Sequence, residues 1–238
     1  MKFRHTREKL LMKIINLPCK NEDILDLKTG DIFYVHGTLV TGRDEVYHRV
    51  VQEGISAPVD LNGMAVYHAG PIVKKADPPF SAQLKQCAQL KQYAQLKQCA
   101  QLKQCTKWQL ISIGPTTSAR MEKWAADFIR ITGIKIMIGK GGMGDKTASA
   151  CREYKAVHCV YPGGCAVLGA GQIEKIEDCL WQDLGMAECL WVMRTYNFGP
   201  LVVSIDTNGN NLYAENYANY SERKKLTLNN IFAYCNLL

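Results

Sequence analysis

KIMIGKGGMGDKTASACREYKAVHCVY, residues 135–161, is the stretch that decides the fold class. Its two ends, 135–138 and 157–161, are rich in β-branched and apolar residues, which is typical of strands. Between them, a glycine-rich loop leads into a segment with helical spacing, Thr147 to Tyr154. A strand, a loop, a helix and a further strand in this order predict an α/β domain.

The same alternation continues on both sides of this stretch. A helix is expected over about 119–131, with apolar residues at helical spacing and a stop at Gly133. A shorter helix is expected over 166–172. The remaining strands are expected at 32–40, 64–68, 110–113, 190–194 and 201–205. Because no linker divides the chain, residues 12–238 are expected to form one α/β domain.

The composition excludes several classes of protein. The chain has 238 residues, of which 47% are hydrophobic and 21% charged, so it is neither a disordered chain nor a disulfide-rich miniprotein. Its longest apolar runs are strand-sized and too short to cross a membrane. The basic residues 1–11 lead into no sustained apolar stretch, so a secretory signal is not indicated and we expect a cytoplasmic protein with reduced thiols.

A hexapeptide repeat distorts these totals. Residues 82–105 read AQLKQC four times, with Tyr93 the only deviation. The four lysines of the repeat and the net +3 of residues 1–11 account for the whole formal charge of +7. The body of the chain is therefore neutral, and a nucleic-acid partner is not indicated.

The repeat itself has two interpretations. A six-residue step rotates the leucines around three faces of a helix, so they form no coiled-coil seam. We therefore expect an insert in a surface hairpin without a catalytic role. A helical interaction arm remains the alternative.

Cationic residues occur in glycine-containing loops that follow strands. Arg43 lies within 37–49, Arg120 within 114–120 and Lys140 within 139–144. The last two loops, and a fourth at 161–165, precede expected helices, whose N-terminal N–H groups can face an anion. Together they predict a site for a small, multiply anionic ligand.

Each of these features also has a structural interpretation. A glycine-rich turn is often only a tight connection. The 139–147 loop matches neither the phosphate-loop pattern nor GxGxxG. We expect His36, His48, His68 and His158 to be structural residues, and Cys159 and Cys165 to be small buried ones.

Several motifs match a known family. They are LKTGDIFYVHGTLVTGRDEVYHR (27–49), DLNGMAVYHAGPIV (60–73), IGPTTSARME (113–122), TGIKIMIGKGGMG (132–144), YPGGCAVL (161–168), DLGMAECLWV (183–192) and FGPLVVSIDTNGNNL (198–212). With these motifs, residues from about Met12 to Arg223 resemble the C-terminal domain or beta subunit of class I iron–sulfur fumarases and related hydro-lyases. The branch that dehydrates tartrate to oxaloacetate is the most similar, and malate and fumarate are the alternative substrates.

The resemblance implies a swivelling β/β/α domain that supplies half of an active site. An alpha subunit would hold a four-iron four-sulfur cluster on its own cysteines, and two alpha–beta pairs would form the assembly. The resemblance gives no metal ligand to this chain.

The same resemblance assigns roles to single residues. Arg43, Arg120 and Lys140 would bind the substrate carboxylates, and Thr116 would take part in proton abstraction. That Thr116 only caps the following helix is the alternative. A stand-alone anion- or nucleotide-binding domain and a repeat-bearing interaction protein are the competing functions.

Overall fold

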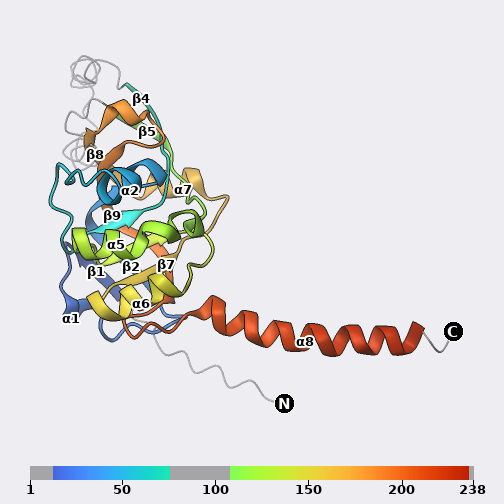
Figure 1. Ribbon diagram of the computed structural model, residues 1–238. Helices are drawn as coiled ribbons and strands as arrows, with labels where there is room; N and C mark the ends of the chain where they lie inside the picture. The colour runs from blue at the N-terminus through green and yellow to red at the C-terminus, as the bar shows by residue number, and fades with distance from the viewer. Residues whose placement is uncertain (1–12, 76–107, 236–238) are drawn as a thin grey trace.

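The computed structural model describes residues 13–75 and 108–235 (Figure 1). Seven strands form one sheet in the order β1-β2-β3-β6-β7-β9-β8. Their bounds are β1 Lys13–Leu17, β2 Ile32–Thr41, β3 Ala65–Tyr67, β6 Ile136–Gly139, β7 Val157–Val160, β8 Ile173–Leu180 and β9 Leu190–Ile205. The α/β class predicted from the sequence is confirmed.

Five of these strands close into a ring. Strands β2, β3, β6 and β7 pair in parallel, and β9 pairs antiparallel with both β7 and β2. The circuit of pairings therefore returns to its start, as in a small barrel. Strands β1 and β8 extend the ring beside β2 and β9.

Alternation along the strands divides the core in two. Ala65, Tyr67 and Ile138 belong to one buried cluster, whereas the intervening Val66 and Met137 belong to the other. The second cluster also contains apolar residues of the helices that cover the sheet in Figure 1. These helices are α2 Asp44–Val51, α5 Glu122–Thr132 and α6 Asp145–Tyr154.

The remaining elements are short, apart from one long helix. They are α1 Asn21–Ile24, η1 Ser118–Met121, α7 Ala166–Gly171 and η2 Gln182–Leu184. A separate hairpin pairs β4 Ile72–Lys75 with β5 Trp108–Ser112. Helix α8, Leu212–Cys235, extends away from the body of the domain (Figure 1). None of the helices within 13–75 and 108–235 is long and apolar enough to cross a bilayer.

Most of the expected elements are present with small shifts of their bounds. Helix α5 ends at Gly133, which has φ 68° and accepts the left-handed conformation at the helix end. The two strands expected at 190–194 and 201–205 are instead one strand, β9. Strand β2 pairs with both halves of β9, at Thr38–Arg194 and Phe33–Leu201, so the ladder continues past the interruption around Gly199.

Sequence patterns did not predict β1, α1, α2, β4, β8 and α8. The hexapeptide insert 82–105 and residues 1–11 lie outside the described residues. The insert falls between β4 and β5, which pair antiparallel, so the described strands flank it as the two arms of a hairpin.

Candidate active site

The segments that follow the parallel strands β3 and β6 meet the loop 114–118 at the carboxyl ends of these strands. The backbone N–H of Thr116 donates to the carbonyl of His68 at 2.7 Å. The N–H of Lys140 donates to the carbonyl of Thr116 at 3.0 Å, and the N–H of Ser118 donates to that of Lys140 at 2.9 Å. Thr116 and Lys140, 24 residues apart in the sequence, are therefore held side by side by the backbone.

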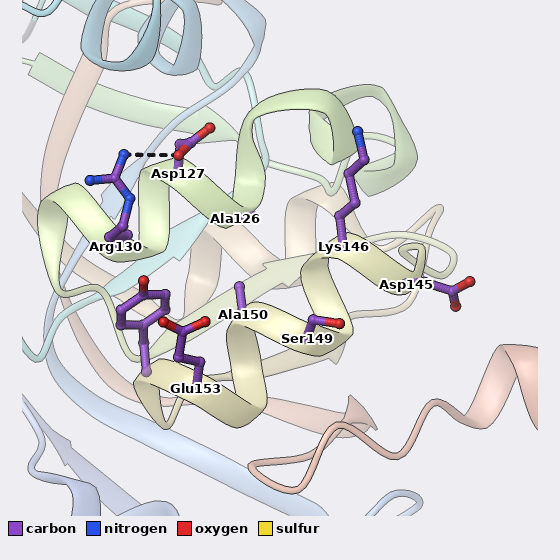
Figure 2. A pocket seen from close by; sticks show the side chains of 9 residues that line it. Ala126, Asp127, Arg130, Asp145, Lys146, Ser149, Ala150 and Glu153 are labelled. Carbon is purple, nitrogen blue, oxygen red and sulfur yellow. Dashed lines mark hydrogen bonds and ion pairs between the residues drawn. The ribbon is translucent and has the colours of Figure 1, made fainter.

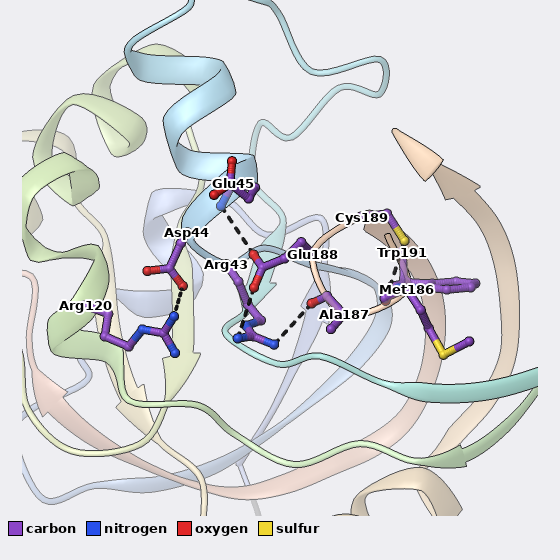
Figure 3. A network of polar contacts seen from close by, with 9 residues as sticks. All are labelled: Arg43, Asp44, Glu45, Arg120, Met186, Ala187, Glu188, Cys189 and Trp191. Atoms are coloured by element: carbon purple, nitrogen blue, oxygen red, sulfur yellow. Dashed lines mark hydrogen bonds and ion pairs between the residues drawn. The ribbon is translucent and has the colours of Figure 1, made fainter. Parts of the chain in front are cut away.

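The two predicted arginines lie close to each other, on either side of Asp44 (Figure 3). Arg43 is the N-cap residue of α2, and Arg120 lies in η1. The Nη2 atom of Arg120 is 2.7 Å from Oδ2 of Asp44, the residue that follows Arg43. A Cβ built on Gly70, two residues after His68, would lie 2.5 Å from Nη1 of Arg43. The structure thus brings all four predicted residues into one region.

The three predicted cations differ in exposure and in charge balance. The Arg43 side chain is 19% exposed and pairs with Glu188, at 3.0 Å between Nη2 and Oε1. The Arg120 side chain is 48% exposed and pairs with Asp44. Lys140 is exposed, and within the described ranges no ion pair involves it. Each arginine is accordingly matched by one carboxylate of the chain, and Lys140 supplies the uncompensated positive charge.

The glycine-rich loop after β6 corrects one expectation. The N-terminus of α6 was expected to face a ligand anion, but the carboxylate of Glu122 already occupies it. Oε2 of Glu122 accepts the N–H of Gly144 at 2.7 Å and the hydroxyl of Thr147 at 2.6 Å, and Oε1 accepts the N–H of Thr147 at 3.3 Å. This carboxylate satisfies the helix N-terminus from inside the chain.

A buried histidine supports the loop that carries Thr116. His68 is fully buried, and its ring contacts the hydroxyl of Tyr47 at 2.8 Å and that of Ser118 at 2.9 Å. Burial, and next the neighbouring His158, hold the pKa of His68 well below its usual value. A Cβ built on Gly139 would lie 1.9 Å from Oγ of Ser118, so the contact between His68 and Ser118 requires glycine at position 139. The neutral imidazole therefore ties β3 to the loop 114–118.

Thr116 itself is half-buried, and its position weighs against a capping role. The first helical turn is η1, which begins at Ser118. Thr117 is the N-cap residue of that turn, and its side chain makes no capping hydrogen bond. The charge of Arg120, which could have acted on the Thr116 hydroxyl one turn away, is directed to Asp44.

His158 and Cys159 agree with their structural interpretation, whereas the expectation that Cys165 is buried is wrong. His158 and Cys159 are fully buried, and Cys165 is partly exposed. Burial raises the pKa of the thiols of Cys151 and Cys159, which disfavours the thiolate that metal binding needs. Among the residues that the structure describes, no group of three or more His, Cys, Asp or Glu could hold a metal ion.

A surface hollow lies elsewhere, between α5 and α6 (Figure 2). Acidic and basic side chains alternate around it, among them Asp127, Arg130, Lys146 and Glu153, and Arg130 pairs with Asp127 at 2.9 Å. None of the four predicted site residues lines it. Its mixed charge favours no ligand class, so the convergent loops remain the candidate site.

Sequence reasoning missed the carboxylates that organise this site. Glu122 and Glu188 both lie inside motifs of the family resemblance, but their partners are distant in the chain. Only the folded structure shows that Glu188 reaches Arg43 and that Glu122 reaches the loop of Lys140.

Comparison with known proteins gives one family. The model of the fumarase C-terminus family matches residues 3–83 and 81–216. The chain is 45% identical over 214 residues to the L(+)-tartrate dehydratase subunit beta of Escherichia coli strain K12, covering 90% of this chain and 92% of that protein.

Two more distant relatives extend the comparison. A putative L(+)-tartrate dehydratase subunit beta of Methanocaldococcus jannaschii is 35% identical over 198 residues, covering 82% of this chain and 87% of that protein. A putative class I fumarate hydratase of Geobacillus stearothermophilus is 32% identical over 201 residues, covering 84% of this chain but 33% of that longer protein.

Proposed function

This chain belongs to the fumarase C-terminus family, and from that premise we propose that it is the beta subunit of a hydro-lyase that dehydrates L(+)-tartrate to oxaloacetate. The convergence of Thr116, Lys140, Arg43 and Arg120 at one edge of the sheet carries the proposal. The 45% identity to a tartrate dehydratase beta subunit supports tartrate as the substrate. A class I fumarase subunit acting on malate and fumarate is the second candidate, favoured by the Geobacillus relative.

The proposed reaction explains why cations are needed at this edge. Dehydration of a 2-hydroxy dicarboxylate removes a proton next to a carboxylate, so negative charge accumulates on that group. Guanidinium groups match carboxylate geometry, and cations placed where charge develops stabilise the transition state. In the proposal, Arg43, Arg120 and Lys140 bind the two carboxylates, and the enol formed by loss of water becomes oxaloacetate.

The iron–sulfur cluster of the proposal belongs to the partner. The described residues of this chain do not fit a cluster. They contain no group of three or more side chains that could ligate a metal ion, and burial disfavours ionisation of the Cys151 and Cys159 thiols. We therefore assign the four-iron four-sulfur cluster to an alpha subunit, in an assembly of two alpha–beta pairs. This chain contributes the carboxylate-binding cations and the Thr116 hydroxyl to a site shared with that subunit.

Thr116 is proposed to take part in proton abstraction. A threonine hydroxyl is protonated at neutral pH, so it requires a neighbouring base to accept its proton. We place that base on the alpha subunit, facing the half-buried Thr116. General acid–base groups contribute roughly 10²- to 10⁴-fold to rate, which sets the expected loss on removal of the hydroxyl.

The test uses the complex of both subunits, co-expressed without oxygen. Thr116→Ala should lower kcat by about 10²-fold or more, Thr116→Ser should retain more activity, and Thr117→Ala serves as the adjacent control. Near-normal turnover of Thr116→Ala would refute the assignment of Thr116. Dehydration rates with L-tartrate, D-tartrate and malate decide between the tartrate dehydratase and the fumarase. Inactivity with all three compounds despite an intact cluster would refute the proposal that the complex is a hydro-lyase.

A further inference from the structure

Arg43 is held in place by a turn of the chain that the proposed reaction does not use (Figure 3). Its Nη2 lies 3.0 Å from Oε1 of Glu188, and its Nη1 donates to the carbonyl of Ala187 at 3.3 Å. Both partners belong to the connection between β8 and β9. The guanidinium, on a side chain only 19% exposed, is therefore fixed through two of its nitrogens by adjacent residues.

Glu188 also contacts the backbone of the helix that carries Arg43. Its Oε2 accepts the N–H of Glu45, in the first turn of α2, at 3.3 Å. One carboxylate thus holds both the side chain of the N-cap residue and the helix N-terminus behind it. A charged acceptor is favourable at both places.

The turn that carries Glu188 is itself well anchored. The N–H groups of Glu188 and Cys189 donate to the carbonyl of Gly185 at 3.0 and 2.9 Å. The indole N–H of Trp191, a buried residue of β9, donates to the carbonyl of Met186 at 2.9 Å. Glu188 therefore projects from a backbone segment with little freedom to move.

Gly70 packs against the contact between Arg43 and Ala187. A Cβ at this position would lie 2.5 Å from Nη1 of Arg43 and 2.9 Å from the carbonyl oxygen of Ala187. Gly70 follows His68, whose carbonyl binds the N–H of Thr116. The position of the guanidinium is thus defined relative to the loop of Thr116.

We propose that Glu188 is a positioning residue, which holds the guanidinium of Arg43 in the orientation that binds a substrate carboxylate. The inference rests on the proposed function, because Arg43 is a substrate-binding residue there. Glu188 also offsets one positive charge, which by itself weakens attraction of a dianion. Orientation outweighs this effect, since a displacement of about 1 Å in a catalytic group can cost ~10²-fold in rate.

The chain offers a matched control, because a second ion pair also joins α2 to the connection between β8 and β9. Asp183, in η2 of the β8–β9 connection, pairs with Arg49 of α2, at 2.6 Å between Oδ2 and Nη2. Asp183→Asn therefore weakens the attachment of this connection to α2 without touching Arg43. A merely structural role for Glu188 would give the two variants the same phenotype.

The experiment measures kcat and KM of the alpha–beta complex with L-tartrate, with malate as the second substrate. Glu188→Ala should lower kcat/KM by ~10- to 100-fold, through both a lower kcat and a higher KM. Glu188→Gln should recover part of this loss, because its amide oxygen can still accept a hydrogen bond from Arg43. Asp183→Asn should stay within about twofold of the unmodified complex, as expected for an exposed ion pair.

A double-mutant cycle with Arg43→Ala separates the two proposals. If Glu188 acts through Arg43, Glu188→Ala should cause no further loss once Arg43 is removed. Three results would each overturn the positioning role alone. The losses of kcat/KM in Glu188→Ala and Arg43→Ala could be additive, the kcat/KM of Glu188→Ala could equal that of Asp183→Asn, or it could exceed that of the unmodified complex. Full activity of Arg43→Ala would overturn the role of Arg43 in the proposed function and this inference with it.

Gly70→Ala provides a second route to the same answer if Glu188→Ala does not fold. The added methyl group would lie too close to Nη1 of Arg43 and to the carbonyl oxygen of Ala187, so it would disturb the contact that fixes the guanidinium. We expect a comparable loss of kcat/KM. An unchanged kcat/KM in a folded Gly70→Ala complex would show that the position of Arg43 does not matter.

Discussion

His158 should make the folded chain sensitive to acid. Its ring is fully buried, and its Nδ1 lies 2.5 Å from Oγ of Ser204. The Ser204 hydroxyl donates to the carbonyl of His158 at 3.1 Å, so it must accept a hydrogen bond from Nδ1–H. Nε2 is then the unprotonated nitrogen, and it is buried without a partner among the described residues. A proton added there would create a buried charge with no acceptor.

The size of the loss of stability in acid follows from the pKa of His158. Burial lowers the pKa of His158 from its usual 6.5 to about 3. Above pH 6.5 both the folded and the unfolded chain carry a neutral imidazole, so the group has no effect on stability. Between pH 6.5 and about 3 the unfolded chain binds a proton that the folded chain excludes, so the free energy of unfolding falls as the pH falls. At about 1.4 kcal/mol per pH unit, His158 alone costs about 2 kcal/mol at pH 5.

This loss is a substantial fraction of the ~5–15 kcal/mol that stabilises a typical domain. His68 acts in the same direction, because burial, and next the neighbouring His158, lower its pKa as well. The pair of rings, 6.2 Å apart, should therefore make the chain markedly less stable at pH 5 than at pH 7.5.

Urea unfolding followed by tryptophan fluorescence at pH 7.5 and pH 5 measures the effect. His158→Asn should reduce the difference between the two pH values by about 2 kcal/mol relative to the unmodified chain. Ser204→Ala is the matched control, since it perturbs the same site but keeps the imidazole, and it should retain the full pH dependence. Equal pH dependence in His158→Asn and the unmodified chain would refute the reasoning.

Two further predictions concern the loop of Lys140 and the insert. Glu122→Ala should lower the free energy of unfolding by about 2 kcal/mol, because it removes the carboxylate that caps α6, whereas Asp127→Asn on the same helix should change it little. Urea unfolding distinguishes the two variants, and an equal small effect would contradict the capping role. Replacing 82–105 by a short turn should preserve both assembly with the alpha subunit and tartrate dehydration, since hairpin tips tolerate insertions. Loss of either, measured by co-purification and by turnover, would favour the interaction-arm alternative.

The parts of the fold that the sequence predicted are those with strong local patterns. Strand β6 is apolar along its length, β7 is apolar apart from His158, and α5 has apolar residues at helical spacing with glycine at its end. Helix α2 was missed because its eight residues follow directly on a strand and carry charges at both ends. Strand β8 was missed because its glutamates and lysine interrupt the apolar pattern, as expected for a strand at the edge of a sheet.

The candidate site shows a similar division. Arg43, Thr116, Arg120 and Lys140 lie in motifs that carry the family resemblance, so they could be named before the structure was known. Their arrangement could not, because it depends on contacts such as that between Glu45 and Glu188, which are 143 residues apart. No local pattern in the sequence encodes such a pair.

Contacts between distant parts of the sequence also determine which groups can bind the substrate at the helix N-termini. The sequence indicated anions at the N-termini that follow the glycine loops, and the structure places the chain's own carboxylates at two helices of the site, Glu122 at α6 and Glu188 at α2. A substrate carboxylate at either N-terminus would have to displace a fixed carboxylate and meet its repulsion. Recognition of the dicarboxylate is therefore left to side-chain cations, with Lys140 supplying net positive charge and Glu188 determining where Arg43 can meet the substrate.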